Sequence, residues 1–228
     1  MGSHSEEGAG VLTPSLQELI DRSQEPLGNP CVSGDVASLA KDGRLGATEL
    51  GELLMARNGF YSFGSALLVR PLRNRSEPLG IEEWNAEGLW KHEYEGRLDS
   101  LLCFAEDVFG SQFALSEDAI VLVDPETGEC EQIGRSLEEW ASAILQDADY
   151  RTGQPLAREW EMKNGRLSPG YRLLPKVPFV TGGKFVVDNL YAGADVEGMQ
   201  FRGSIARQIR DVPDGGHVTF EVEPPRES

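Results

Sequence analysis

The chain has 228 residues, of which 39% are hydrophobic, a composition typical of a globular protein with one large domain. Its formal net charge of -17 disfavours binding to nucleic acid or to an anionic membrane surface, and we expect neither as a partner. No stretch approaches the ~18 consecutive apolar residues of a membrane span, and the first ten residues lack the pattern of a signal peptide.

The cysteine content bears on compartment and on metal binding. Cys31, Cys103 and Cys130 are odd in number and far apart, so they fit neither a disulfide framework nor a zinc site. We therefore expect a reduced, cytoplasmic protein that holds no metal and no cofactor.

The N-terminal part is predicted to contain two short helices. Residues 1–10 are small, polar and acidic, and we expect them to be disordered. Thr13-Pro14 marks the start of the first helix, because threonine caps helices and proline fits the first helical position. Residues 24–46 are interrupted by glycine and proline and are predicted to be a loop with at most short helical turns. Residues 48–57 are predicted to form the second helix, capped by Thr48.

Strands dominate the middle of the chain, where aromatic and β-branched residues alternate with turn residues. They are expected within 60–69, at 101–104, at 113–115, at 119–123 and at 129–133. A hairpin turn is predicted at 124–128, because Pro125 presets its own dihedral angle and Gly128 accepts a positive φ. Residues 80–90 contain two of the four tryptophans and follow no clear period.

A helix with a capping box follows the last of these strands. Ser136 and Glu139 have the spacing at which two side chains satisfy the free N–H groups of a helix start. Apolar residues then recur with helical period as far as Ala148. A further helix is predicted at 154–163.

The rest of the chain, 166–222, is predicted to be loops and short secondary-structure elements, followed by a tail over 223–228. Short strands are expected at 171–174, at Phe179, at 184–187 and at 217–222, and a helical turn or short helix at 203–210. Helices precede a strand meander and do not alternate with strands, so we predict an α+β fold. No linker divides the chain, and we expect a single domain over 11–222.

No residue pattern indicates an enzyme. The sequence contains no Gly-x-Ser-x-Gly nucleophile turn and no local Cys/His signature, so a structural or surface role is expected for each histidine, including His92 with its nearby acidic residues. The run Thr181-Gly182-Gly183-Lys184 is similar to the end of a phosphate loop, but Pro178 and Phe185 occupy positions that the loop reserves for Gly and for Ser or Thr. Adjacent carboxylates are abundant, yet neighbours on a strand face opposite sides, so a carboxylate-dependent hydrolase is the least favoured hypothesis.

Charge is distributed unevenly along the chain. Residues 77–129 hold 14 Asp or Glu against 2 Lys or Arg, whereas residues 151–210 hold 10 Lys or Arg against 5 Asp or Glu. An acidic run is usually a solvated surface, but it can also be the docking site of a basic partner. Trp84 and Trp90 lie in the acidic run among charged residues, and tryptophan is enriched at interface hot spots.

The order of motifs over 101–145 resembles the SUKH superfamily, bacterial proteins related to a fungal regulator of cell-wall assembly. The resemblance rests on four segments, FAEDVFG at 104–110, QFAL at 112–115, IVLVDPETGE at 120–129 and SLEEW at 136–140. A later run, RLLPKVPFVTGGKF at 172–185, looks like the C-terminal extension of a longer subgroup. The resemblance implies an α+β domain with a mainly antiparallel sheet and flanking helices, here a core over 48–150 and an extension over 151–222.

Many members of that superfamily are immunity proteins, which neutralise a secreted toxin by stoichiometric binding without catalysis. The resemblance therefore implies a non-enzymatic protein whose partner is a cognate toxin, and the acidic run favours a basic toxin such as a nuclease. The alternative is a regulatory or scaffold module without a toxin partner. Oligomeric state is left open. The residues expected to contact the partner are Trp84, Trp90, Glu106, Asp107, Glu117 and Asp118.

Overall fold

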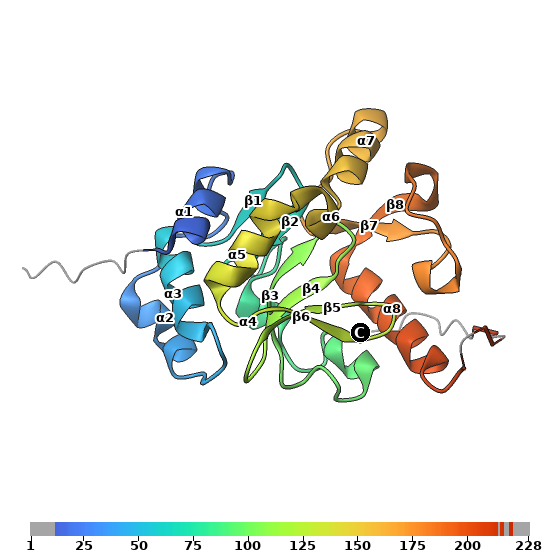
Figure 1. Cartoon of the computed structure of the whole chain (residues 1–228), viewed down its shortest axis with the longest axis horizontal. Coiled ribbons are helices and arrows are strands. Elements are labelled where there is room, and N and C mark those ends of the chain that lie inside the picture. The colour runs from blue at the N-terminus through green and yellow to red at the C-terminus, as the bar shows by residue number, and fades with distance from the viewer. Residues whose placement is uncertain (1–11, 214, 217–218, 221–228) are drawn as a thin grey trace, which may run out of the picture.

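A six-stranded antiparallel sheet forms the centre of the fold (Figure 1), seen in a computed structural model that describes residues 12–213, 215–216 and 219–220. The strands pair in chain order, so the sheet is a simple meander. Its members are β1 (Phe60–Ser62), β2 (Leu67–Val69), β3 (Leu102–Asp107), β4 (Gln112–Leu115), β5 (Ile120–Val123) and β6 (Cys130–Gly134). A second, two-stranded sheet pairs β7 (Tyr171–Pro175) with β8 (Leu190–Ala194).

The helices are distributed along the whole chain. The α-helices are α1 (Pro14–Asp21), α2 (Ser33–Ala40), α3 (Ala47–Ala56), α4 (Ile81–Trp84), α5 (Leu137–Gln146), α6 (Ala148–Thr152), α7 (Gln154–Asn164) and α8 (Asp195–Ile209). Three 3-10 helices add to these, namely η1 (Lys91–Tyr94), η2 (Phe179–Thr181) and η3 (Val187–Asn189).

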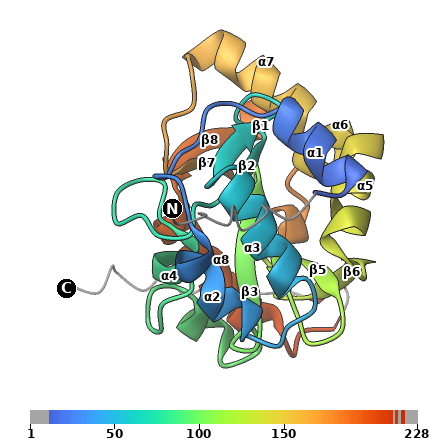
Figure 2. The same ribbon diagram turned by 90° about the vertical axis from the view of Figure 1, so that its left-hand side faces the viewer.

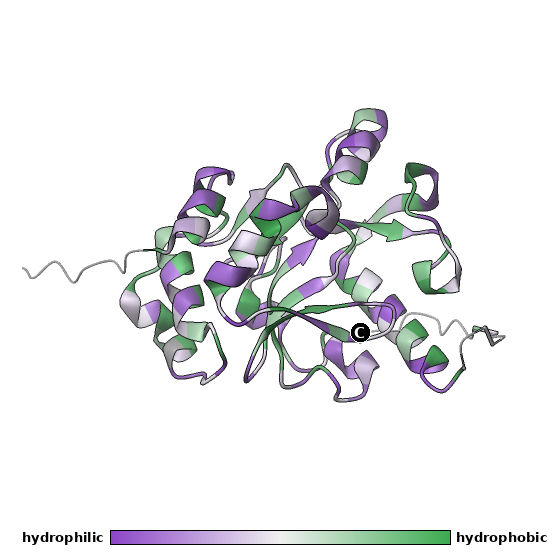
Figure 3. Ribbon diagram, viewed as in Figure 1, coloured by the Kyte–Doolittle hydropathy of each residue, from purple (hydrophilic) through white to green (hydrophobic). Residues whose placement is uncertain are grey.

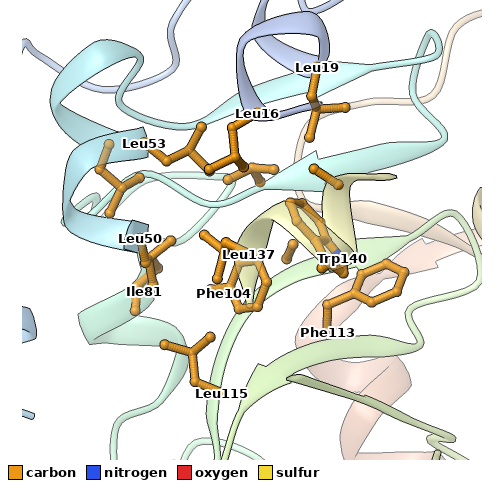
Figure 4. Packing of buried hydrophobic residues seen from close by; sticks show 14 of the residues in the cluster. Leu16, Leu19, Leu50, Leu53, Ile81, Phe104, Phe113, Leu115, Leu137 and Trp140 are labelled. Atoms are coloured by element: carbon orange, nitrogen blue, oxygen red, sulfur yellow. The ribbon is translucent and has the colours of Figure 1, made fainter. Parts of the chain in front are cut away.

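One face of the large sheet packs against the N-terminal helices and α5. Figure 4 shows Leu16 of α1, Leu50 of α3 and Trp140 of α5 pointing into a common core with strand side chains. The ring centroid of Trp140 lies 5.0 Å from that of Phe104 and 5.7 Å from that of Phe113, both in edge-on geometry. Each of these rings is fully buried, and rings of this size dominate the energy of a core.

The opposite face packs against residues 81–98 and α8, so both faces of the sheet are covered (Figure 2). Neighbouring strand residues alternate between the two cores: Phe104 belongs to the first, and Cys103 to the second. Burial on both faces explains why the central strands β3, β4 and β5 contain continuous apolar runs. A helix that packs on the sheet contacts it with only one of its sides, and the helices accordingly carry both hydrophobic and hydrophilic residues (Figure 3).

Predictions based on local signals are confirmed. The fold is α+β with an antiparallel sheet, and the strands expected from 101 to 133 are present as β3 to β6. The Ser136 side chain accepts a hydrogen bond from the Glu139 N–H, as the capping box predicts. Glu139 itself accepts from the Arg135 N–H, one residue before the cap.

Several predicted boundaries were wrong. Residues 33–40 form helix α2, not a loop, and the cap of α3 is Gly46, not Thr48. The single strand expected within 60–69 is a hairpin, because the chain reverses at residues 63–66. Two predicted short strands are absent: Phe179 begins the 3-10 helix η2, and residues 184–187 form an irregular connection whose last residue, Val187, begins η3.

The C-terminal part contains more regular structure than its sequence indicates. The short helix expected at 203–210 belongs to α8, which has 15 residues and begins at Asp195. Strand β8 was not predicted. Of the strand expected at 217–222, residues 217–218 and 221–222 lie outside the described part, as do the N-terminal residues 1–10 and the tail. Within the described part, no helix has the length and apolar character needed to cross a membrane.

Candidate functional site

The two tryptophans expected to anchor a partner lie inside the protein. Trp84 and Trp90 are both 0% exposed, and their ring centroids are 5.4 Å apart. The Trp84 Nε1–H donates to Gln112 Oε1 at 2.8 Å, and the Trp90 Nε1–H donates to the Trp84 carbonyl at 2.9 Å. Both rings pack in the core beside the sheet, so this structure does not expose the surface that the sequence predicts for them.

Glu106 is also buried, at the centre of a charge network that joins the sheet to the C-terminal extension. Its Oε1 lies 2.6 Å from Arg172 Nε and 3.0 Å from Arg70 Nη2, and its Oε2 accepts from Gln112 Nε2 at 2.8 Å. Arg70 also pairs with Asp195 at 3.0 Å. Burial alone would raise the pKa of Glu106, but the two guanidinium groups and Gln112 lower it to about 2. Glu106 is therefore a structural ion, and no partner can reach it.

Asp107 is 7% exposed and lies at the end of β3. Its Oδ1 accepts hydrogen bonds from the Phe109 and Ser111 N–H groups, each at 2.8 Å, and so shapes the tight β3–β4 turn. Burial raises the pKa of Asp107 to about 7, although these N–H donors oppose the shift. Its primary contacts are thus within the turn, and its contribution to an exposed acidic surface is small.

Glu117 and Asp118 are exposed, as a surface role requires. They lie in the turn between β4 and β5, where the Ser116 hydroxyl accepts from the Asp118 N–H. The structure thus separates the six expected contact residues: these two are on the surface, and the other four are buried.

A large groove opens at the other end of β5. Its volume is about 720 Å³, and it lies between three parts of the chain that are distant in sequence. These are the β5–β6 hairpin, the α6 region from Asp149 to Leu156, and the C-terminal extension with Phe179, Phe185 and Arg202. A concave site of this size is the usual place for a ligand or an inserted partner segment.

Three phenylalanines form one wall of this groove. The Phe179 and Phe185 rings are stacked at a centroid distance of 3.8 Å, and Phe109 meets both edge-on, at 5.9 and 5.5 Å. Phe185 is 58% exposed, and Tyr150 on the α6 side is 75% exposed. Two aromatic rings are therefore available to a partner here, whereas Trp84 and Trp90 are not.

Carboxylates dominate the polar part of the groove. Six line it, against the two guanidinium groups of Arg151 and Arg202; the carboxylates are Asp107, Asp124, Glu126, Glu129, Glu131 and Asp149. Arg151 is 3.2 Å from Glu131, and the Arg202 guanidinium donates to the Phe109 carbonyl. Burial raises the pKa of Glu126, whose Oε2 accepts from the Val180 N–H at 2.8 Å. The groove therefore suits a ligand that is cationic and partly apolar.

The buried carboxyls predict how stability changes with pH. A carboxyl with a raised folded-state pKa stabilises the fold below its unfolded pKa, and this contribution is lost as the pH rises through the folded value. Asp107, whose pKa in the folded protein is about 7, stabilises the fold at acidic pH and loses this contribution as the pH rises toward 7. Glu106 has a lowered pKa of about 2, so its contribution is lost as the pH falls below ~4.3 toward 2. We expect the highest melting temperature between about pH 4 and 5, with a fall toward pH 8.

Thermal unfolding followed by circular dichroism from pH 3 to 8 tests this profile. The D107N variant should show a smaller fall between pH 4 and 7, because asparagine keeps an acceptor oxygen for Phe109 and Ser111 but cannot ionise. A wild-type melting temperature that rises from pH 5 to 8 would contradict the assignment.

The sequence contained signals for some of these groove residues. Tyr150 falls outside the apolar phase of α5, between Asp149 and Arg151, which is a pattern of surface exposure. Asp124 and Glu129 belong to the acidic run, but their local pattern predicts only the start of a hairpin turn and the start of its return strand. The groove itself could not be predicted, because it requires residues 124–131 to meet residues 179–202. Among the described residues, no group of three or more His, Cys, Asp or Glu is arranged to hold a metal ion.

Comparison with known proteins adds evidence on the fold. No family model matches the chain, and no curated protein matches it. The chain is similar to a crystal structure from Agrobacterium tumefaciens, Atu4351, with a TM-score of 0.57 and 14% sequence identity. The match covers 81% of this chain and 86% of that chain. At this identity the similarity extends to the fold alone.

Proposed function

We propose that this protein is a cytoplasmic immunity protein that neutralises a basic bacterial toxin by stoichiometric binding. The observation that carries the proposal is the groove, which is lined by carboxylates together with exposed aromatic rings. Such a surface attracts a basic partner from a distance and then offers apolar area for tight contact. The net charge of -17 and the resemblance of residues 101–145 to immunity proteins of the SUKH superfamily support the same function.

The inhibitory contact is expected to lie at the groove. Three carboxylates of the groove are exposed and do not pack in the core, namely Asp124, Glu129 and Asp149. Tyr150 and Phe185 take the role of aromatic anchors that the buried Trp84 and Trp90 cannot fill. A nuclease toxin fits this chemistry, because its substrate-binding surface must be basic.

Two matched charge reversals locate the contact surface. The first, Glu129→Lys with Asp149→Lys, alters the groove, and the second, Glu117→Lys with Asp118→Lys, alters the β4–β5 turn by the same charge. The partner to test is any toxin-domain protein that a neighbouring gene encodes. The first variant should associate with it roughly 10- to 100-fold more slowly at low salt, and its rate should depend less on salt. Stopped-flow association measures both rates.

The second variant should associate at close to the wild-type rate. Slower association of that variant alone would move the contact to the β4–β5 turn. If no neighbouring toxin-domain protein forms a complex, the proposed function is wrong, and the regulatory or scaffold alternative takes its place.

One observation favours a second candidate, a carboxylate-dependent hydrolase. Asp107 lines the groove beside other carboxylates, and a pKa of about 7 is what a general acid requires at neutral pH. Against it, both hydrogen bonds of Asp107 Oδ1 serve the β3–β4 turn. We expect no hydrolysis of a panel of chromogenic glycosides, whereas turnover that is lost in D107N would favour the enzyme.

A further inference from the structure

The strand beside the groove has an unpaired edge. Strand β6 is last in the order of the large sheet, so β5 is its one neighbour among the described strands. Its first three residues, Cys130, Glu131 and Gln132, are exposed. The other end of the sheet is different, because β1 is extended by a bridge between Ser62 and Ser23. A free edge can accept an added strand, so β6 is a candidate docking site for an extended segment of another chain.

The register of the hairpin shows which backbone groups are free. The Asp124 N–H donates to the Glu129 carbonyl, so this pair is hydrogen-bonded across the hairpin. In an antiparallel pair such positions alternate with non-bonded ones, which places the N–H groups of Cys130 and Gln132 on the outer side. No described residue accepts a hydrogen bond from either of them outside the sheet.

The charge around this edge selects its partner. Glu129 and Glu131 flank Cys130, and Asp149 lies across the groove that Cys130 and Glu131 also line. Antiparallel pairing with a second copy of β6 would bring these glutamates against one another, which disfavours self-association. A strand with basic side chains would meet opposite charges at the same positions.

We infer that β6 binds an extended basic segment of the partner, which adds a seventh strand to the sheet. Its backbone hydrogen-bonds to Cys130 and Gln132, and its alternate side chains meet the carboxylates of the groove. This inference rests on the proposed function for the identity of the partner, but the binding mode can be tested without the toxin.

A model peptide tests the mode directly. The probe is an octapeptide of alternating lysine and valine, with an analogue of the same charge that is N-methylated at every residue. Cys130 reports binding, because its exposed thiol can be alkylated, and Cys31 serves as an internal reference in the same molecule. We expect the unmodified peptide to slow alkylation of Cys130 at least fivefold at saturation and to leave Cys31 unchanged, as read by peptide mass spectrometry. The N-methylated analogue should protect much less, because it lacks backbone donors.

Two variants at position 132 separate the backbone from the side chain. Gln132→Pro removes one outward N–H group, which edge strands tolerate, and Gln132→Ala removes the side chain alone. The peptide concentration that gives half-maximal protection of Cys130 should rise about tenfold in the proline variant and stay within twofold of wild type in the alanine variant. Equal protection by both peptides, or none, would overturn the inference even where the toxin complex forms. If Q132P does not fold, the comparison of the two peptides on the wild-type protein still tests the inference.

Discussion

Replacing Glu106 with glutamine should destabilise the protein by about 3–5 kcal/mol, because it leaves buried guanidinium groups without their shared anion. Arg70 and Arg172 are 0% and 1% exposed, and both contact Glu106 Oε1. In E106Q, Asp195 is the one remaining anion of the network, and it reaches Arg70. For a chain of this length we expect a melting temperature lower by ~10 °C, measured by circular dichroism at pH 7.

Matched variants separate the network from the loss of a charge. Glu117→Gln makes the same chemical change at an exposed site and should alter stability by less than ~0.5 kcal/mol. Combining E106Q with Arg172→Met removes the uncompensated cation and should recover part of the loss. A fall of less than 1 kcal/mol for E106Q would mean that solvent reaches the network.

The network also shows why local patterns could predict much of the fold and little of the site. The β3–β6 meander and α5 were predictable because turn residues, alternation and a capping box specify them within short stretches. Glu106 looked like a surface residue because its partners, Arg70 and Arg172, are 36 and 66 residues away in the sequence. The lowered pKa of Glu106 and its burial follow from that long-range contact, which no local pattern encodes.

Helix α8 illustrates the same limit in a different way. Its glycines Gly198 and Gly203 weaken the helical signal, yet both are required by close packing. A Cβ atom at Gly203 would lie 2.6 Å from the Glu93 side chain, and one at Gly198 would lie 2.8 Å from Leu174. Tertiary packing therefore stabilises α8 where intrinsic propensity does not.

Replacing Trp84 with alanine should cost about 3–5 kcal/mol of folding stability. The side chain is fully buried, Arg70 Cζ lies 3.5 Å from its ring centroid, and its Nε1–H donates to Gln112. The substitution leaves a cavity under a buried cation and an unpaired Gln112 Oε1. Urea unfolding followed by far-ultraviolet circular dichroism measures the change, and the exposed Glu117→Gln variant provides the baseline.

The W84F variant distinguishes a core role from a role in binding. Phenylalanine keeps an aromatic ring beneath Arg70 but has no N–H group for Gln112, so W84F should lose less stability than W84A. Affinity for the proposed toxin partner, measured by calorimetry on the folded fraction of either variant, should stay within about threefold of wild type, because a ring that is 0% exposed cannot touch a partner. A large loss of affinity in a W84F protein of near-normal stability would mean that the segment 81–98 opens on binding, and would return Trp84 to the interface. Substitution of Trp84 should therefore lower stability without lowering affinity. Substitution of Tyr150 or Phe185 should lower affinity without lowering stability.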